Sequence, residues 1–211
     1  MFTQDYRTKR EEGMKRDKSV EEWIAWEDRY IQTYLSVLGE GGIKGPVLDM
    51  GCGTNHLARA FKARDIEAEG IDVDRADFEK DKLPYRDNQF QTATLHAIIE
   101  HLFKPDNLMK ELSRVIASGG LVIIRTTNWQ SDFRNFYNDP THVKPYTPLG
   151  MTRLLNMYGF KTFFLEPGLI CKSHAYWKLP AWAKWRVAKL IKGGTRTMLV
   201  MARNTKNHGK I

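Results

Sequence analysis

An acidic residue and two glycines stand at alternate positions in the segment VLDMGCGTNHLARAF, which is residues 47–61. Asp49 ends an apolar run, Gly51 and Gly53 follow it, and the chain then becomes amphipathic. A structural turn needs one glycine and does not need the carboxylate, so the spacing indicates a loop that binds a ligand. Glycines let the backbone turn tightly and approach a ligand that a Cβ atom would exclude. Because open α/β sheets bind ligands outside the carboxyl ends of their strands, we expect the ligand there.

Two other glycine-rich loops do not explain this segment. A dinucleotide-binding loop, G-x-G-x-x-G, would need its third glycine at position 56, where the chain has His56. A phosphate-binding loop of the form G-x-x-x-x-G-K-[ST] occurs nowhere in the sequence. The loop therefore belongs to a different class of binding site.

The elements that must position this loop alternate along the chain. Short apolar runs separated by amphipathic segments indicate parallel βαβ units in an α/β sheet that is covered on both faces. We expect strands over 47–51, 67–72, 91–96, 121–127, 161–166 and 196–202, and helices over 55–63, 106–117, 147–158 and 180–192. Ser118-Gly119-Gly120 is expected to end the second helix, and Gly159 the third.

The chain of 211 residues fits one domain. Ser19 and Glu22 form a capping box, which predicts the start of a helix. Aromatic and apolar residues recur along this helix mostly at three- and four-residue steps, and they are Trp23, Trp26, Tyr30, Tyr34 and Leu35. We expect residues 1–40 to form a helical lead or lid with a packing face, and residues 41–211 to form the main domain.

The segment that begins at Val47 resembles the first motif of class I S-adenosylmethionine-dependent methyltransferases, in which alternating glycines follow an acid. Asp49, Gly51 and Gly53 match this motif, and Asn55 stands where a third glycine often lies. The resemblance continues through EGIDVD, ADFEKDKLPYRDNQF and TLHAIIEHLFKPDNLMKELSRVIASGGLVIIRTTN. It implies a Rossmann-like fold with a mostly parallel seven-stranded sheet, helices on both faces and an antiparallel last strand. It also implies the cofactor S-adenosyl-L-methionine, with S-adenosyl-L-homocysteine as the product.

The same resemblance assigns further residues to the cofactor. Asp72, followed by Val73, ends the second strand and would accept hydrogen bonds from the ribose hydroxyls; as a single residue it could also be a loop acid. Asp77 would accept from the adenine amino group, and Phe78 would flank the adenine ring. Only ten residues separate Asp72 from Leu83, so we expect a short third strand, and the register of Asp77 stays open.

Three histidines are candidates for the site. His96, at the end of a predicted strand, either flanks the cofactor or is a structural histidine satisfied by hydrogen bonds. Methyl transfer is an in-line attack on a methyl group that the sulfonium activates, and a hydroxyl acceptor benefits from a base of near-neutral pKa. We prefer His142, in the segment NDPTHVKPYTP, as this base. His101 is the competing candidate, although the Glu100-His101 pair could instead fix the start of a helix through a buried hydrogen bond.

The segment around His142 is long, polar and rich in aromatic residues. Long loops at the carboxyl edge of a sheet commonly carry binding residues. We expect Trp129 and Tyr146 to contact the acceptor. Asp139 would orient His142 or contact the acceptor, or it would only form a turn with the proline that follows it.

The composition limits the partners. Cys52 and Cys171 are the only cysteines and have no metal-like spacing, so we expect neither a disulfide framework nor a metal site. The net charge of +8 comes from residues 168–211, which hold ten Lys or Arg and no acid, whereas 23 basic and 25 acidic residues precede them.

The chain lacks the motifs of DNA methyltransferases and a separate RNA-binding module. We expect a small-molecule acceptor, such as a saccharide, lipid-linked or natural-product hydroxyl or amine. A binding protein without turnover and an RNA methyltransferase are the alternatives.

The basic segment at residues 177–192 is expected to be an amphipathic helix from Pro180 onward. Its apolar side either packs on the sheet or, with its tryptophans set among cations, makes weak contact with anionic lipid headgroups. The chain contains no apolar run of 18 residues and its start lacks the apolar region of a secretory signal. We therefore expect a cytoplasmic protein, with contact to the inner face of a membrane as an option. The sequence predicts no particular oligomeric state.

Overall fold

The computed structural model describes Glu22, Ile31, Leu35, residues 39–168, Pro180, Ala183 and residues 197–206. Glu22, Ile31 and Leu35 are helical, and the last two are buried, which agrees with a packed N-terminal helix. The aromatic residues expected on its face lie outside the described residues. Ala183 is helical and donates to the carbonyl of Pro180, while the rest of segment 177–192 lies outside the described residues, so its membrane contact stays a prediction.

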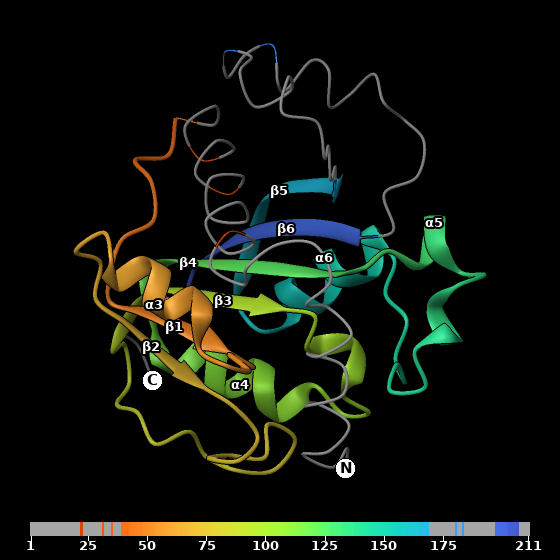
Figure 1. Ribbon diagram of the computed structural model, residues 1–211, viewed down its shortest axis with the longest axis horizontal. Helices are drawn as coiled ribbons and strands as arrows, with labels where there is room; N and C mark the ends of the chain where they lie inside the picture. The colour runs from red at the N-terminus through yellow and green to blue at the C-terminus, as the bar shows by residue number, and fades with distance from the viewer. Residues whose placement is uncertain are drawn as a thin grey trace.

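Six strands form one sheet in the order β2-β1-β3-β4-β6-β5 (Figure 1). The strands are β1 (Val47–Met50), β2 (Ala68–Ile71), β3 (Phe90–His96), β4 (Ile116–Thr127), β5 (Phe160–Gly168) and β6 (Thr197–Asn204). The first four strands pair in parallel, and β6 runs antiparallel to both β4 and β5. The expected α/β class and the antiparallel last strand are therefore confirmed.

The expected count of seven strands is wrong for the part of the chain that the structure describes. Residues 72–89 consist of turns and bends, so no strand stands between β2 and β3 in the sequence. The physical reason is that the connection between β2 and β3 is short. Its buried residues pack over one face of the sheet, so they do not add a strand at its edge. Phe78, Leu83 and Tyr85 all belong to the core cluster on one face.

Helices cover both faces of the sheet. They are α3 (His56–Lys62), η1 (Ile99–His101), α4 (Asp106–Val115), α5 (Trp129–Asp132), η2 (Phe136–Asn138) and α6 (Pro148–Met157). One core cluster joins α4 and α6 to the strands, with Leu112 and Met151 among its buried residues. The other joins α3 to the N-terminal residues Ile31 and Leu35. Among the described residues, no helix combines the length and the apolar character that crossing a membrane requires.

The boundary between α4 and β4 differs from the expectation. The helix ends at Val115 and the strand begins at once with Ile116, so the predicted stop at Ser118-Gly119-Gly120 is wrong. These glycines instead form an irregularity inside β4, where the register with β3 shifts. A Cβ atom on Gly120 would lie 2.6 Å from Cγ2 of Ile116, so only glycine fits there. The predicted start of α6 is confirmed, because Thr147 Oγ1 accepts from the N–H of Gly150.

Candidate functional site

The glycine loop, defined here as residues 51–55, leaves the carboxyl end of β1 with three left-handed residues. The φ angles are 71° at Gly51, 50° at Gly53 and 61° at Asn55. A Cβ atom on Gly51 would also lie 1.9 Å from Cδ1 of Ile98, so this position needs glycine for space as well as for conformation. Asparagine enters the left-handed region more readily than other side chains, which explains how Asn55 replaces a third glycine.

Asp72 ties the glycine loop to the end of β2. Its Oδ2 accepts from the N–H of Gly53 at 2.8 Å, and its Oδ1 accepts from the N–H of Val73 at 2.6 Å. The N–H of Gly51 donates to the carbonyl of Ile71 at 2.8 Å. The predicted contact of Asp72 with the ribose stays a prediction. The structure adds a second role for Asp72, which is to hold the shape of the glycine loop.

Gly70 on β2 is a residue of this site that the sequence reasoning missed. A Cβ atom there would lie 2.2 Å from Oδ1 of Asn55 and 2.7 Å from Cβ of Cys52. The bare Cα of Gly70 therefore makes room for the loop to rest on β2. A glycine inside a short strand, two positions before Asp72, was the available signal.

Asp49 is buried beneath the loop rather than exposed at its surface. Its Oδ1 accepts from the hydroxyl of Thr94 at 2.7 Å. Burial raises the pKa of Asp49 to about 6, while the charge of His96 acts in the opposite direction. Burial lowers the pKa of His96, which lies within the electrostatic reach of both Asp49 and Glu100. His96, at the end of β3, is therefore close to Asp49 under the glycine loop and to Glu100 in η1.

Asp77 and Phe78 follow β2 but have structural roles in this connection. Asp77 Oδ1 accepts from the N–H of Glu79 at 2.9 Å, and this bond is the main cause that lowers its pKa. Its Oδ2 lies 3.2 Å from the ammonium of Lys80. Phe78 is only 5% exposed and packs in the core. The adenine contacts predicted for both residues stay predictions.

A second group of polar residues, the histidine cluster, consists of Glu100, His101 and His142. Glu100 and His101 lie in η1 just after β3, whereas His142 comes from the loop between η2 and α6. The two imidazole rings have centroids 4.8 Å apart and are tilted by 54°. One ligating atom from each of the three residues lies within 4.8 Å of the others. The structure therefore brings both predicted catalytic histidines together with a carboxylate.

Hydrogen bonds at Nδ1 set the orientation of both imidazole rings. His101 Nδ1 lies 3.0 Å from the carbonyl oxygen of Thr141 and 2.8 Å from its Oγ1, which itself donates to Asp139 Oδ1 at 2.5 Å. His142 Nδ1 lies 2.7 Å from the carbonyl oxygen of Phe136. Because a carbonyl only accepts, this network assigns the hydrogen to Nδ1 and the lone pair to Nε2 in each neutral ring.

Glu100 fastens the loop of His142 to η1. Its backbone carbonyl accepts from the N–H groups of Val143 and Lys144, at 2.9 and 3.1 Å. Its carboxylate is 1% exposed and accepts from the hydroxyl of Thr126 on β4 at 2.8 Å. Burial raises the pKa of Glu100. These bonds explain why residues so far apart in sequence meet here, and Thr126 and Thr141 were not foreseen from the sequence.

Asp139 takes part in both of the roles that were left open. Its Oδ1 accepts from the N–H of Thr141 at 2.9 Å, which is the expected turn. Its Oδ2 lies 3.9 Å from Nε2 of His142, which is close enough to stabilise a protonated ring. Asp139 therefore both shapes the loop and faces His142.

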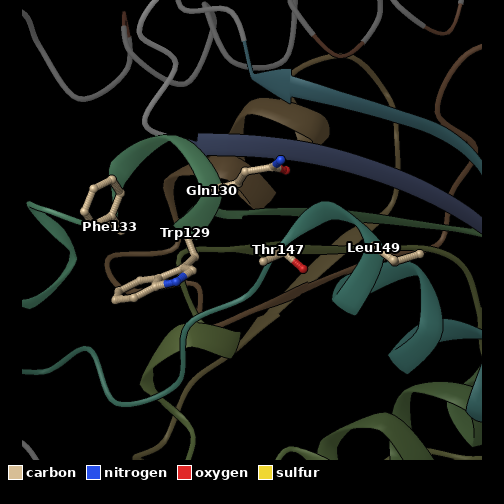
Figure 2. A pocket seen from close by; sticks show the side chains of 5 residues that line it. All are labelled: Trp129, Gln130, Phe133, Thr147 and Leu149. Carbon is tan, nitrogen blue, oxygen red and sulfur yellow. The ribbon is translucent and has the colours of Figure 1, made fainter.

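A pocket of ≈ 410 Å³ opens between α5 and the start of α6. Trp129, Gln130, Phe133, Thr147 and Leu149 line it. Figure 2 shows Trp129 and Phe133 on one side of this pocket, with Thr147 and Leu149 on the other. The edge of Trp129 packs on Phe136 with centroids 5.3 Å apart, and Phe136 lies 4.7 Å from the ring of His142. The pocket and the histidine cluster are thus joined through one aromatic side chain.

Tyr146 does not line this pocket. Its side chain is 6% exposed and belongs to the core cluster that contains α4 and α6. Burial raises its pKa, and its hydroxyl has no hydrogen-bond partner among the described residues. Its backbone carbonyl accepts from the N–H of Trp129 at 2.9 Å, so it positions a residue of the pocket. Direct contact with the acceptor stays a prediction.

Comparison with known proteins identifies the family. A family model described as a methyltransferase domain matches residues 23–163. An uncharacterized protein of Methanocaldococcus jannaschii is 28% identical over 137 residues, which span 58% of this chain and 66%, just under two thirds, of that protein.

Two solved structures share the fold. A SAM-dependent methyltransferase of Archaeoglobus fulgidus has a TM-score of 0.57 and 21% identity, covering 83% of this chain and 94% of its own. A methyltransferase solved with the Trm112 methyltransferase activator of Haloferax volcanii has a TM-score of 0.59 and 16% identity, covering 89% and 96%. With the glycine loop, the strand order and the family match in agreement, the chain belongs to the class I S-adenosylmethionine-dependent methyltransferases.

Proposed function

We propose that the protein transfers a methyl group from S-adenosylmethionine to a hydroxyl group of a small-molecule acceptor. The observation that carries this proposal is a pair of histidines, each held through Nδ1 by a carbonyl and with ring centroids 4.8 Å apart, next to an aromatic pocket. A pocket of this volume suits a small molecule, since ligand pockets commonly measure about 300–1,000 Å³. Saccharide, lipid-linked and natural-product hydroxyls are the acceptor classes that we propose.

The glycine loop fits the cofactor in shape and in charge. Its backbone is bare at Gly51 and Gly53, and Asp72 presents a carboxylate at the neighbouring strand end. The loop contains no Lys or Arg, which suits a ligand without phosphate groups. When bound, S-adenosylmethionine supplies a methyl group that its sulfonium has already activated. We propose that Asp72 and Val73 hold the ribose, with His96 beside the cofactor.

The chain must then orient the acceptor and exclude water. Trp129 and Phe133 offer apolar ring surfaces, and Gln130 and Thr147 offer hydrogen bonds. Correct orientation of two reactants can supply about 7–11 kcal/mol of the barrier reduction. We propose that these four side chains set the acceptor preference.

His142 is the proposed base. Its Nδ1–H donates to the carbonyl of Phe136, which leaves the lone pair on Nε2. In the reaction, Nε2 takes the hydroxyl proton, and Asp139 at 3.9 Å stabilises the imidazolium that forms. His101 is held by Thr141 beside it and acts as the second candidate for proton removal. An amine acceptor that is already neutral would not need this base.

Calorimetric titration with S-adenosylmethionine, followed by turnover assays on hydroxyl and amine acceptors, tests the proposal. We expect one cofactor per chain and methylated product from a hydroxyl acceptor. Cofactor binding without turnover on any acceptor would favour a binding protein of this fold. Failure to bind the cofactor would overturn the proposal.

A further inference from the structure

We propose that Glu100, His101 and His142 bind a divalent transition-metal ion, and that its open coordination positions receive the acceptor hydroxyl. This inference departs from the expectation that the chain has no metal site. Its second half rests on the proposed methyl transfer, whereas its first half concerns only the three side chains. The structure carries it through the placement of the ligands, the bonds that support them and the charge of the cluster.

The placement of the ligands suits one metal ion. The three ligating atoms lie within 4.8 Å of one another. Metal–nitrogen and metal–oxygen bonds of about 2.0–2.2 Å separate neighbouring ligands by about 3 to 4.4 Å, so small side-chain rotations complete the site. Two histidines and one carboxylate form a set that leaves further positions open for a substrate.

Each ligand is supported as metal ligands commonly are. A ligating histidine usually donates its other ring N–H to a carbonyl or carboxylate, which fixes the ring and its tautomer. His101 and His142 both follow this pattern, through the carbonyls of Thr141 and Phe136. The Glu100 carboxylate is fixed by the hydroxyl of Thr126. The hydrogen bonds that support the three ligands thus exist before any ion arrives.

The charge of the cluster favours a cation. Glu100 is 1% exposed, and no ion pair neutralises it within the part of the chain that the structure describes. Burying an ionised carboxylate is costly unless a positive charge compensates for it. Imidazole ligands favour Fe²⁺, Co²⁺ or Zn²⁺ over Mg²⁺ or Ca²⁺, which prefer oxygen ligands.

The bound ion changes how the acceptor loses its proton. Coordination lowers the pKa of a hydroxyl, so the O–H bond breaks with release of the proton to water. The oxygen then forms a bond to the methyl carbon while the carbon–sulfur bond breaks and leaves a neutral thioether, with one proton released per turnover. In the loaded protein His142 is a ligand, and the ion replaces it as the group that activates the hydroxyl.

Titration of the full-length, chelator-treated protein with Co²⁺ tests the site without any acceptor, because Co²⁺ bound by nitrogen and oxygen absorbs visible light. We expect one strong site per chain, with each of Glu100→Gln, His101→Gln and His142→Gln weakening it at least tenfold. Thr141→Val, which acts indirectly through His101 and Asp139, should weaken it less. The matched control is Glu67→Gln, because Glu67 is an exposed acid outside the cluster and its loss should leave the site unchanged. Circular dichroism checks that each variant is folded.

A second measurement separates this inference from the proposed methyl transfer. S-adenosylmethionine should bind the chelated protein as it binds the untreated one, while turnover should fall at least tenfold in chelator, where only the His142 base remains, and recover with added Fe²⁺, Co²⁺ or Zn²⁺. Full turnover in chelator would overturn the catalytic half and leave methyl transfer standing. Ligand variants that bind Co²⁺ as tightly as the control would overturn the metal site itself, whatever the cofactor result.

Discussion

The glycine loop and the histidine cluster lie near the same carboxyl edge of the sheet but are built in different ways. The glycine loop is made of backbone, with left-handed residues at Gly51, Gly53 and Asn55, and the Asp72 carboxylate accepts from the N–H of Gly53. The histidine cluster is made of side chains from η1 and from the loop after η2, supported by β4. A single added methyl group, as in a Gly→Ala substitution, can disrupt the glycine loop. The histidine cluster loses its function when a side-chain functional group is removed. The two regions should therefore fail separately.

His142→Gln is expected to have the largest effect of these substitutions. It should lower kcat through the histidine cluster and leave the glycine loop unchanged. Removing a general base or a metal ligand should lower kcat on a hydroxyl acceptor by about a thousandfold, within the range of about 10²–10⁴ for acid–base catalysis. Cofactor affinity, measured by calorimetry, should stay within about twofold of wild type. A loss of affinity as large as the loss of kcat would mean that the two regions are not separate.

Gly51→Ala should disrupt the glycine loop and weaken cofactor binding. The new Cβ atom would overlap Cδ1 of Ile98, so that side chain or the loop must move, and φ of 71° strains any residue other than glycine at this position. We expect cofactor affinity to fall by about a hundredfold or more, equivalent to about 2.7 kcal/mol. Gly119→Ala is the matched control, because Gly119 has φ of 74° but nothing within 4 Å of its Cβ position. That variant should lose about 1 kcal/mol of stability and keep its cofactor affinity.

Asp49→Asn should show that the buried, ionised carboxylate of Asp49, next to the glycine loop, lowers the stability of the folded protein. The folded pKa of about 6 exceeds the ordinary value of 3.8, so the folded state holds this proton more tightly than the unfolded state does. The contribution of Asp49 to stability is therefore fully present below pH 3.8 and is lost as the pH rises through 6. In urea unfolding, Asp49→Asn should be more stable than wild type by about 3 kcal/mol at pH 8, and close to it below pH 4. A variant that is less stable at pH 8 would refute this account of the buried acid.

Asp72→Ala tests the bond between the loop and β2, with a smaller expected effect. It removes the acceptor for the N–H groups of Gly53 and Val73, and with it the proposed ribose contact. Cofactor binding should weaken by more than about tenfold, or about 1.4 kcal/mol. Asp74→Ala removes a nearby exposed acid and serves as the control. Equal affinities in the two variants would remove Asp72 from the binding site.

The sequence allowed the glycine loop to be predicted because its conformation is encoded locally. The spacing of Asp49, Gly51 and Gly53 predicted a tight turn after a strand, and the left-handed residues Gly51 and Gly53 form that turn. The pattern also predicted the strands, the start of α6 and the class of the sheet. Gly70 was missed because its neighbour, Asn55, comes from another segment of the chain.

The histidine cluster could be predicted only as separate residues. His101 and His142 were candidates by type and position, but their meeting with Glu100 depends on hydrogen bonds to Thr126 and Thr141 that no local pattern encodes. Tyr146 shows the reverse case. As an aromatic residue in a polar loop it was expected to contact the acceptor, and the sequence did not show that it is buried in the core cluster of α4 and α6. Its contact with the acceptor stays a prediction. The missing third strand and the early start of β4 have the same cause, since tertiary packing decided both.

The most direct test of the account is a side-by-side calorimetric titration of wild type, Gly51→Ala and His142→Gln with S-adenosylmethionine. The account predicts one site per chain in wild type, an unchanged affinity in His142→Gln and a loss of about a hundredfold or more in Gly51→Ala. Absence of binding in wild type would contradict the proposed cofactor. Equal affinities in Gly51→Ala and wild type would contradict the claim that the glycine loop is where the cofactor binds.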